Sequence, residues 1–406
     1  MCHIISKDAC IPRDHYMSLL RESRGSDFIK VLTGIRRCGK STLMRMFIDE
    51  LKASGVPDDR ILFLNLDDAG AGIESFRDLV DRAESELGDV GGAFILLDEV
   101  QSVSEWERAV STFHIRGADV YIAGSNSEML SSEIATRLSG RCLEIRMQPL
   151  VFSEYVRFRE PGDRERLLED YIRYGGFPAV SLAMDRMPAL VDGILDGIYS
   201  TVFNKDVAGR HEIRGNALIR HLCDHLMRNI GDRVSVRGVA RYLTSKGMKT
   251  QPPTVDQYLG FLEDALLFLR ARRLDSKAKE YLRTTDKFYV ADLGIRHCRV
   301  PFRPEDLDGI MENVVYNELV YRFGSVAVCA VDGYEVDFVA DPMGSPSYYQ
   351  VSVSILDPAT RERELRSLRA IGDNYPKTVI VYDRFPMADI DGIRVVGMLD
   401  WLMESA

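Results

Sequence analysis

Short, continuously apolar runs recur along the first 150 residues and alternate with polar, helix-forming segments. Continuous apolar runs are typical of strands that are buried on both faces of a sheet. Between the first two runs, residues 41–52 place Leu43, Met46, Phe47 and Leu51 on one helical face. Strands that alternate with helices predict a parallel sheet covered on both sides. The five apolar runs are residues 28–33, 61–66, 93–97, 120–123 and 142–145.

A glycine-rich loop joins the first predicted strand to this helix and matches the pattern G-x-x-x-x-G-K-[ST] in full. Glycines let successive backbone N–H groups point at phosphate oxygens, and the helix N-terminus adds partial positive charge. Lys40 can reach the β- and γ-phosphates, and Ser41 can supply an oxygen to Mg²⁺. The loop therefore predicts a binding site for ATP and Mg²⁺. Its residues are Gly34, Ile35, Arg36, Arg37, Cys38, Gly39, Lys40, Ser41 and Thr42.

Two acidic residues, Asp98 and Glu99, end the third apolar run. In open α/β sheets, ligands bind at the edge where the carboxyl ends of the strands lie. Asp98 is suited to holding Mg²⁺, because this ion prefers carboxylate and water oxygens. Glu99 is suited to polarise the water that attacks the γ-phosphate. A structural turn is the alternative for such a pair, and the upstream phosphate loop favours the catalytic interpretation.

Polar and basic residues follow the fourth run. Ser125 and Asn126 are candidates for contacting the γ-phosphate and the attacking water, with Asn126 preferred because its amide both donates and accepts. Helix capping is their alternative role. Arg137 and Arg141 are candidates for an arginine finger, Arg141 first, with a surface ion pair as the alternative.

Charge is unevenly distributed over the chain. The 406 residues carry a net charge of −10, yet residues 228–287 hold 13 Lys and Arg against 7 Asp and Glu. A basic segment in an acidic protein indicates a local anionic partner, or a solvated helical surface. Seven widely spaced cysteines are typical of free thiols in a reducing compartment. No apolar run is long enough to span a membrane, and no signal peptide is evident, so we expect a cytoplasmic protein without membrane contact.

The basic segment overlaps a helix–turn–helix–hairpin pattern within residues 212–290. This pattern predicts a winged-helix-like domain. A contact with duplex DNA would use Thr254 and Gln257 on the second helix and Arg270, Arg272 and Arg273 on the wing. Acidic residues on the same helix disfavour a contact with DNA, so a protein partner is the alternative.

The last third of the chain predicts a helix that carries Glu318, followed by strands that carry Asp337 and Gln350. This order is similar to the core of restriction-endonuclease-like domains, whose acids hold Mg²⁺ and whose lysine stabilises charge. Ser352 stands at the lysine position, and a hydroxyl supplies no fixed positive charge. The expectation is a nuclease-like fold used for binding, with an active nuclease as the alternative.

The chain as a whole resembles the AAA-like P-loop ATPases of bacteria and archaea that carry a C-terminal domain of uncharacterised function. The resemblance implies an α/β fold with a P-loop NTPase parallel sheet core, followed by a helical and winged-helix segment and a C-terminal α/β restriction-endonuclease-like domain. The expected domains are residues 1–150, 151–211, 212–290 and 291–406. The motifs that carry the resemblance are residues 33–41, 97–101, 123–127, 138–141, 149–155, 174–178 and 316–319.

The sequence therefore predicts a Mg²⁺-dependent ATPase that drives or gates its C-terminal modules. Two alternatives remain at this point: a nucleotide-gated DNA- or protein-binding switch with little hydrolysis, and an ATP-linked nuclease. A finger arginine acts on the site of a neighbouring copy in many such enzymes, so a homo-oligomer is also expected.

Overall fold

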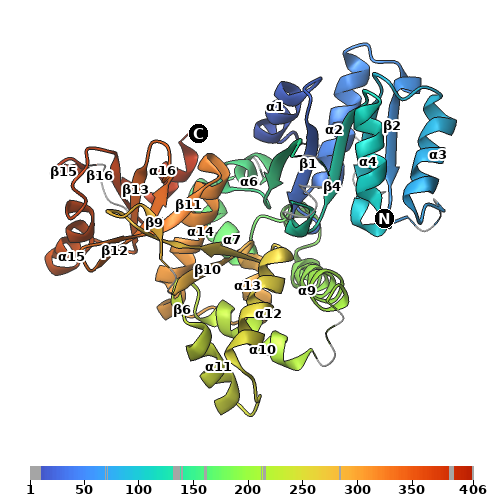
Figure 1. The fold of residues 1–406 in the computed structure, drawn as a ribbon. Helices are drawn as coiled ribbons and strands as arrows, with labels where there is room; N and C mark the ends of the chain where they lie inside the picture. The colour runs from blue at the N-terminus through green and yellow to red at the C-terminus, as the bar shows by residue number, and fades with distance from the viewer. Residues whose placement is uncertain are drawn as a thin grey trace. The chain divides into compact units, whose positions relative to one another are not determined.

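The computed structural model describes residues 11–68, 70, 72–130, 138, 140–159, 162–211, 213, 216–282, 285–383 and 388–404. The chain divides into two compact units, whose elements are labelled in Figure 1. The N-terminal unit comprises Met1–Met147 and Asp264–Leu266, and the C-terminal unit comprises Gln148–Glu263 and Leu267–Ala406. The finer division into four domains stays a prediction.

The N-terminal unit is built on a five-stranded parallel sheet in the order β2-β3-β4-β1-β5. All five strands coincide with the predicted apolar runs, and the predicted parallel α/β core is confirmed. The strands are β1 (Ile29–Gly34), β2 (Ile61–Asn65), β3 (Phe94–Asp98), β4 (Asp119–Gly124) and β5 (Cys142–Met147). The helices are α1 (Asp14–Ser23), α2 (Lys40–Ala53), η2 (Asp58–Arg60), α3 (Phe76–Leu87), η4 (Val100–Ser102), α4 (Trp106–Ile115) and η5 (Ser127–Leu130).

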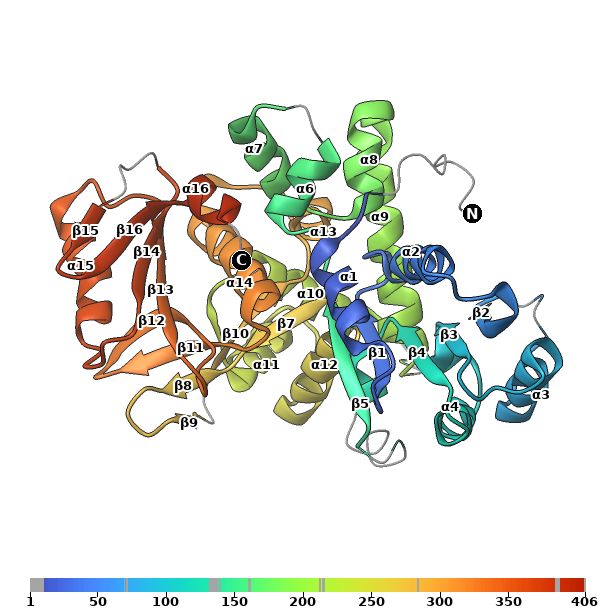
Figure 2. The same cartoon turned by 90° about the horizontal axis from the view of Figure 1, so that it is seen from above.

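Helices cover both faces of this sheet, as Figure 2 shows for α2 on one side and α3 and α4 on the other. The face toward α3 and α4 packs strand residues such as Val31 and Ile122 against Phe113. On the opposite face, the Phe47 ring of α2 lies 5.0 Å from the ring of Tyr121. Strand β1 is buried at every position because it lies inside the sheet, between β4 and β5.

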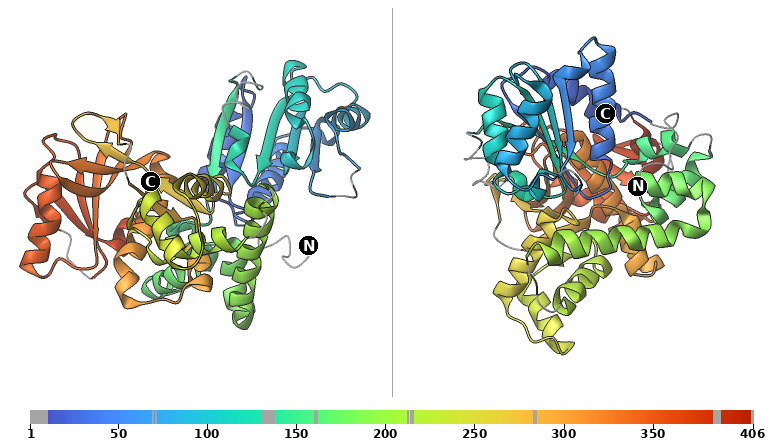
Figure 3. Two further views of the ribbon diagram at one scale, coloured as in Figure 1. Left: turned by 60° about the horizontal axis from the view of Figure 1, so that its bottom comes forward. Right: turned by 90° about the vertical axis from the view of Figure 1, so that its right-hand side faces the viewer.

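The C-terminal unit begins with a group of short helices. Helix α9 runs on into the π-helical segment η7 without a break (Figure 3). Pro178 stands at the first turn of α8, where a missing N–H costs nothing. The elements are α6 (Phe152–Arg159), α7 (Arg164–Tyr174), α8 (Pro178–Arg186), η6 (Pro188–Leu190), α9 (Val191–Thr201) and η7 (Val202–Gly209).

A glycine turn fixes the join between α7 and α8. A Cβ on Gly175, whose φ is +74°, would lie 2.0 Å from Asp292 Oδ1, and one on Gly176 would lie 2.1 Å from the Leu150 carbonyl oxygen. The Gly176 N–H donates to Asp292 Oδ2 at 2.6 Å. Only glycine fits this close approach, so the motif at residues 174–178 is structural.

Three helices and a small antiparallel sheet follow. The sheet has the order β6-β10-β7. These elements are α10 (Ala217–Arg228), β6 (Arg233–Val234), α11 (Val236–Ser245), α12 (Pro252–Asp264), β7 (Phe268–Ala271) and β10 (Asp286–Val290).

The last part of the C-terminal unit is an eight-stranded mixed sheet in the order β15-β16-β14-β13-β12-β11-β8-β9. Strands β8 and β9 lie between β7 and β10 in the sequence, yet β8 pairs with β11. The strands are β8 (Arg273–Asp275), β9 (Glu280–Tyr281), β11 (Val326–Val331), β12 (Tyr334–Ala340), β13 (Ser347–Ser352), β14 (Lys377–Val381), β15 (Ala388–Ile390) and β16 (Ile393–Gly397). The helices are α13 (Leu293–Arg299), η8 (Pro304–Asp306), α14 (Leu307–Phe323), α15 (Pro358–Arg369) and α16 (Met398–Met403).

Candidate functional site

The glycine-rich loop connects the end of β1 to the first residue of α2. Gly39 has a φ of +111°, a conformation that favours glycine. A Cβ on Gly34 would lie 2.4 Å from the Met147 carbonyl oxygen, so no larger residue fits there without a shift of the backbone. Arg37 also has a positive φ and is exposed. The glycines thus permit a tight loop at the N-terminus of α2, where Ser41 and Thr42 occupy the first helical turn.

The lysine of this loop is buried and folded back on its own backbone. Lys40 Nζ donates to the Gly34 carbonyl at 2.8 Å and to the Ile35 carbonyl at 3.4 Å. Its side chain is only 4% exposed. A buried ammonium group therefore lies beside the loop, where a phosphate ligand would replace its carbonyl partners.

Asp98 ends β3 as a fully buried carboxylate. Within the part of the chain that the structure describes, neither Oδ atom has a hydrogen-bond partner of normal geometry. Burial raises the pKa of Asp98, whereas the Ser41 hydroxyl and the Lys40 ammonium lower it. A buried acid without a partner is costly, and a cation would relieve that cost. The carboxylate of Asp98 and the hydroxyl of Ser41 are both oxygen ligands of the kind that Mg²⁺ takes, so they fit this ion.

Glu99 follows directly and is already held by several polar side chains. Its Oε2 accepts a hydrogen bond from Gln101 Nε2 and another, at 3.4 Å, from Ser125 Oγ. The Arg36 guanidinium lies 3.9 Å from the same oxygen and also donates to Ser125 at 3.4 Å. Glu99 has a φ of +56°, which turns the chain sharply at the end of β3.

The polar residues after β4 lie beside this group. Strand β4 stands between β1 and β3, and its register pairs Ala123 with Asp98 and Gly124 with Thr33. The carboxyl ends of the three strands therefore meet at one edge of the sheet. Ser125 and Asn126 are both buried there. The structure thus brings together the phosphate loop, Asp98, Glu99 and the tip of β4, as the sequence predicts.

The candidate arginine finger lies elsewhere. The Arg141 carbonyl accepts a hydrogen bond from the Ile29 N–H at 2.7 Å, at the start of β1. The five residues from there to Gly34 span about 17 Å of strand. Arg141 is exposed and its guanidinium contacts His114 at 3.4 Å. It is therefore remote from the phosphate loop of its own chain. The other candidate, Arg137, lies outside the described residues.

Three residues near the loop were not anticipated from the sequence. Arg13, which is buried, donates to the Cys38 carbonyl at 3.1 Å and so supports the loop from 25 residues upstream. Asp67 lies 3.7 Å from Arg36, and Gln101 contacts Glu99. Asp67 lies just after β2, much as Asp98 lies at the end of β3. Its position after an apolar run could therefore have identified it as a candidate site residue. No local pattern marks Arg13.

Some cations of the basic segment pair with acidic side chains, and others are exposed. Of the predicted wing residues, Arg270 Nε lies 2.7 Å from Asp286 and Arg273 lies 3.4 Å from Glu335, whereas Arg272 is exposed. Strand pairing thus brings acids beside Arg270 and Arg273, and the contact of these wing residues with DNA stays a prediction. On the predicted recognition helix, Gln257 is exposed and Thr254 is half-buried.

Exposed cations lie instead on α11 and in the turn after it. All four are exposed, and no ion pair involves them among the residues that the structure describes. They are Arg237, Arg241, Lys246 and Lys249.

The Asp337 N–H donates to Gln350 Oε1 at 3.3 Å, so two of the three residues of the nuclease interpretation are neighbours. The Arg322 guanidinium lies 2.7 Å from Glu318 Oε1, while Asp337 accepts from the Val351 N–H and lies 3.6 Å from Lys287. Gln350 donates to Glu364 at 2.9 Å. The described ranges contain no group of three His, Cys, Asp or Glu residues arranged to hold a metal ion. The restriction-endonuclease-like identity of this region stays a prediction.

Two family models match parts of the chain. A family model described as an AAA domain matches residues 26–156, and one described as a domain of unknown function (DUF8612) matches residues 165–306. An uncharacterised protein of Methanocaldococcus jannaschii is 28% identical over 393 residues, which cover 91% of this chain and 83% of that protein. No helix in the described part of the chain has the length and apolar character to cross a bilayer.

The fold and the full length of the chain are both shared with other proteins. The Walker-type ATPase of Pyrococcus abyssi is similar in structure, with a TM-score of 0.51 and 18% identity, over 71% of this chain and 95% of that one. An uncharacterised protein of Haemophilus influenzae is 33% identical over 405 residues, covering 98% of this chain and 99% of that protein. The chain therefore belongs to the same family as the Haemophilus influenzae protein, and its residues 26–156 form an AAA domain with the fold of P-loop ATPases.

Proposed function

We propose that this protein binds ATP with Mg²⁺ in the cytosol and hydrolyses the γ-phosphate at the edge of the N-terminal sheet. The observation that carries the proposal is the buried Asp98 carboxylate, which lies without a hydrogen-bond partner of normal geometry next to Ser41 and Lys40. Structural acids are paired when they are buried, so an orphaned one beside a phosphate loop indicates that a cation completes the site.

Each residue of the site takes a role that its position allows. The amides of residues 34–42 surround the phosphates, and the Lys40 ammonium exchanges its carbonyl partners for β- and γ-phosphate oxygens. Ser41 and Asp98 would hold Mg²⁺. When bound, this ion neutralises charge on the phosphate oxygens and helps the leaving group depart.

The hydrolysis step uses Glu99 as the base. Glu99 accepts a proton from water, whose oxygen bonds to the γ-phosphorus. The bond between that phosphorus and the bridging oxygen breaks, and ADP leaves with the electron pair. Asn126 is positioned at the tip of β4 to contact the γ-phosphate and the same water. Ser125 donates to Glu99 at 3.4 Å and so orients its carboxylate.

A matched pair of glutamate variants tests the role of the base. Glu99→Gln removes the proton acceptor but keeps the shape, so hydrolysis should fall at least about 100-fold while ATP affinity is retained. Glu105→Gln, at an exposed position in the same unit, should hydrolyse ATP like the wild type. Release of phosphate and the Kd for ATP are measured on both. Equal turnover by Glu99→Gln and the wild type would remove Glu99 from this role.

A second proposal concerns the basic segment 228–287, which we infer to be a winged-helix-like module that contacts duplex DNA. The four exposed cations of α11 and its following turn favour this function, because phosphate contacts supply most of non-specific affinity. The contact is expected on α11 rather than on the predicted wing, where Arg270 and Arg273 already pair with acids. In this proposal the nucleotide state of the AAA domain gates DNA retention.

Fluorescence anisotropy of a labelled duplex tests this contact. Arg237→Ala/Arg241→Ala should weaken binding and lower the slope of log K against log salt by about 2. The matched control is Arg164→Ala/Arg166→Ala, which removes two exposed cations from α7. Titrations with ATP and with ADP measure the gating. Wild-type affinity in the α11 double variant would exclude this surface, and a protein partner would then be the better explanation.

A further inference from the structure

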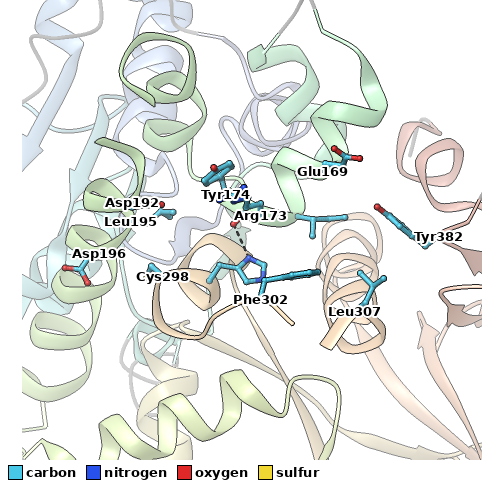
Figure 4. A pocket seen from close by; sticks show the side chains of 12 residues that line it. Glu169, Arg173, Tyr174, Asp192, Leu195, Asp196, Cys298, Phe302, Leu307 and Tyr382 are labelled. Carbon is cyan, nitrogen blue, oxygen red and sulfur yellow. Dashed lines mark hydrogen bonds between the residues drawn. The ribbon is translucent and has the colours of Figure 1, made fainter. Parts of the chain in front are cut away.

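The C-terminal unit contains a large open pocket that the proposed nucleotide and DNA functions do not use. It lies among α7, α9, α13 and the start of α14 (Figure 4). Its volume of about 930 Å³ is in the range of pockets that bind small molecules. The chemistry of the lining residues therefore indicates which kind of ligand the pocket could bind.

Part of the lining is apolar and aromatic. Ile172, Leu195 and Leu307 supply aliphatic surface, and Phe302 and Tyr382 supply rings. Phe302 is 53% exposed, so its ring is accessible to a ligand. This surface would be covered by the hydrocarbon part of a ligand, which gains free energy from the apolar area it removes from water.

The charged part of the lining is mostly negative. Glu169 comes from α7, and Asp192 and Asp196 lie one turn apart on α9. In the described chain, no hydrogen bond or ion pair joins the side chain of any of the three to another residue. Arg173 is the cation among the lining residues, and its guanidinium lies over the Tyr174 ring at 5.0 Å.

The remaining titratable groups of the lining do not offset this charge. Burial, together with nearby Arg296, lowers the pKa of His297 to about 4, so the imidazole is neutral at pH 7. The ring hydrogen-bonds through Nδ1 to the Arg173 carbonyl at 3.0 Å. Burial, together with Asp196, raises the pKa of Cys298 to about 12, so the thiol is neutral too. Three carboxylates against one guanidinium leave the pocket with net negative charge.

The acids stand at two separate places around the apolar lining. Figure 4 shows Glu169 and Tyr382 on one side of Phe302, and Asp192 and Asp196 on the other. We propose that this pocket binds an aliphatic diamine or polyamine, with one ammonium group at Glu169, another at Asp192 and Asp196, and the methylene chain over Phe302 and Leu195. Aromatic faces near the ammonium groups add cation–π attraction.

Calorimetric titration of the full chain with spermidine, in nucleotide-free buffer at fixed ionic strength, tests the proposal. One site per chain is expected. Asp192→Asn/Asp196→Asn should weaken binding about tenfold or more, because two charge-assisted contacts are lost. The matched control Asp59→Asn/Asp256→Asn removes two exposed acids elsewhere and should bind like the wild type. Phe302→Ser, at an exposed position, should also weaken binding.

Chemical controls separate the ammonium groups from the chain between them. Octane-1,8-diamine should bind more tightly than octylamine, and octane-1,8-diol should not bind. Equal affinity of the wild type and the Asp192→Asn/Asp196→Asn variant would overturn the proposal, since it would show a non-specific ion effect. Binding of a lysine-rich peptide without binding of spermidine would also overturn it and assign the pocket to a protein partner. Because no nucleotide is present, failure here leaves the proposed ATPase function untouched.

Discussion

Buried acids have different surroundings in the two units of this protein. At the edge of the N-terminal parallel sheet, Asp98 is fully buried and has no hydrogen-bond partner of normal geometry among the described residues. In the C-terminal unit, Lys287 lies 2.9 Å from Glu312 and 3.6 Å from Asp337, and Glu318 pairs with Arg322. Satisfied networks stabilise a fold, whereas a buried acid without a partner needs an explanation, such as an ion that completes the site.

The phosphate loop is the part of this contrast where we expect the largest effect. Lys40→Ala removes the buried ammonium group that contacts the loop carbonyls, and with it the two charge-assisted contacts to phosphate that we propose for the bound state. ATP affinity should fall at least about 100-fold. Lys52→Ala, on the exposed side of the same helix, is the matched control and should bind ATP normally. Both Kd values are read by calorimetry, and tight ATP binding by Lys40→Ala would be incompatible with the account.

A pair of variants contrasts an unpaired buried acid with a paired buried cation. Lys287→Met removes the cation beside Glu312 and Asp337, and it should destabilise the fold by about 3–5 kcal/mol. Asp98→Asn removes a costly charge, so it should unfold no more easily than the wild type without Mg²⁺, yet hydrolyse ATP at least about 100-fold more slowly. Denaturant unfolding and phosphate release are measured on both.

Lys277→Met is the control for the lysine variant, because its pair with Asp332 lies at the surface, where water screens it, and contributes little to stability. If Lys287→Met were as stable as the wild type, the C-terminal cluster would not be a structural network. If Asp98→Asn lost stability instead, the carboxylate would have a structural partner and the cation site would be in doubt.

The buried Glu318 gives the C-terminal unit a pH dependence. Burial raises its pKa to about 7, although Arg322 beside it lowers it. The folded state therefore holds the proton more tightly than the unfolded state, and the stability that this provides is lost as the pH rises from about 4.5 to about 7. Relative to Glu318→Gln, which does not titrate, the wild type should lose about 3 kcal/mol over this window. If the free energy of unfolding changed equally in the wild type and in Glu318→Gln between pH 5 and pH 8, this prediction would be wrong.

The recovery of activity in a mixture of two inactive variants is the smallest effect that we expect, and it tests whether two copies share a site. Arg141 lies at the edge of the sheet opposite the phosphate loop, so its proposed role as a finger requires a neighbouring copy. Lys40→Ala and Arg141→Ala should each be nearly inactive alone. Mixed in equal amounts, they should recover part of the ATPase rate, because some Arg141→Ala sites would then face an intact arginine. A mixture no more active than the sum of its parts would argue against a shared site.

The sheet that positions the phosphate loop could be predicted from the sequence because its inner strands, β1, β3 and β4, are buried on both faces. Val31 and Ile95 lie in runs that are apolar at nearly every position, and such runs have few other interpretations. Asp98, Glu99 and Asn126 followed from their place directly after those runs. The order of the strands did not follow, since it depends on crossovers that leave no local trace.

The C-terminal unit was harder to interpret because its contacts join distant segments. Helix α14 is buried on nearly all sides, so periodicity gave no reason to choose among its acids. Glu318 faces Arg322, and it is Glu312 that faces Lys287 near Asp337. Likewise, Arg273 pairs with Glu335 because β8 joins β11, a strand more than 50 residues downstream.

The most direct test of the central claim is a calorimetric titration of the purified full chain with ATP, first with Mg²⁺ and then with EDTA. The account predicts one site per chain with Mg²⁺, clearly weaker binding without it, and loss of the Mg²⁺ effect in Asp98→Asn. Absence of any binding heat for ATP and ADP in the presence of Mg²⁺ would contradict it.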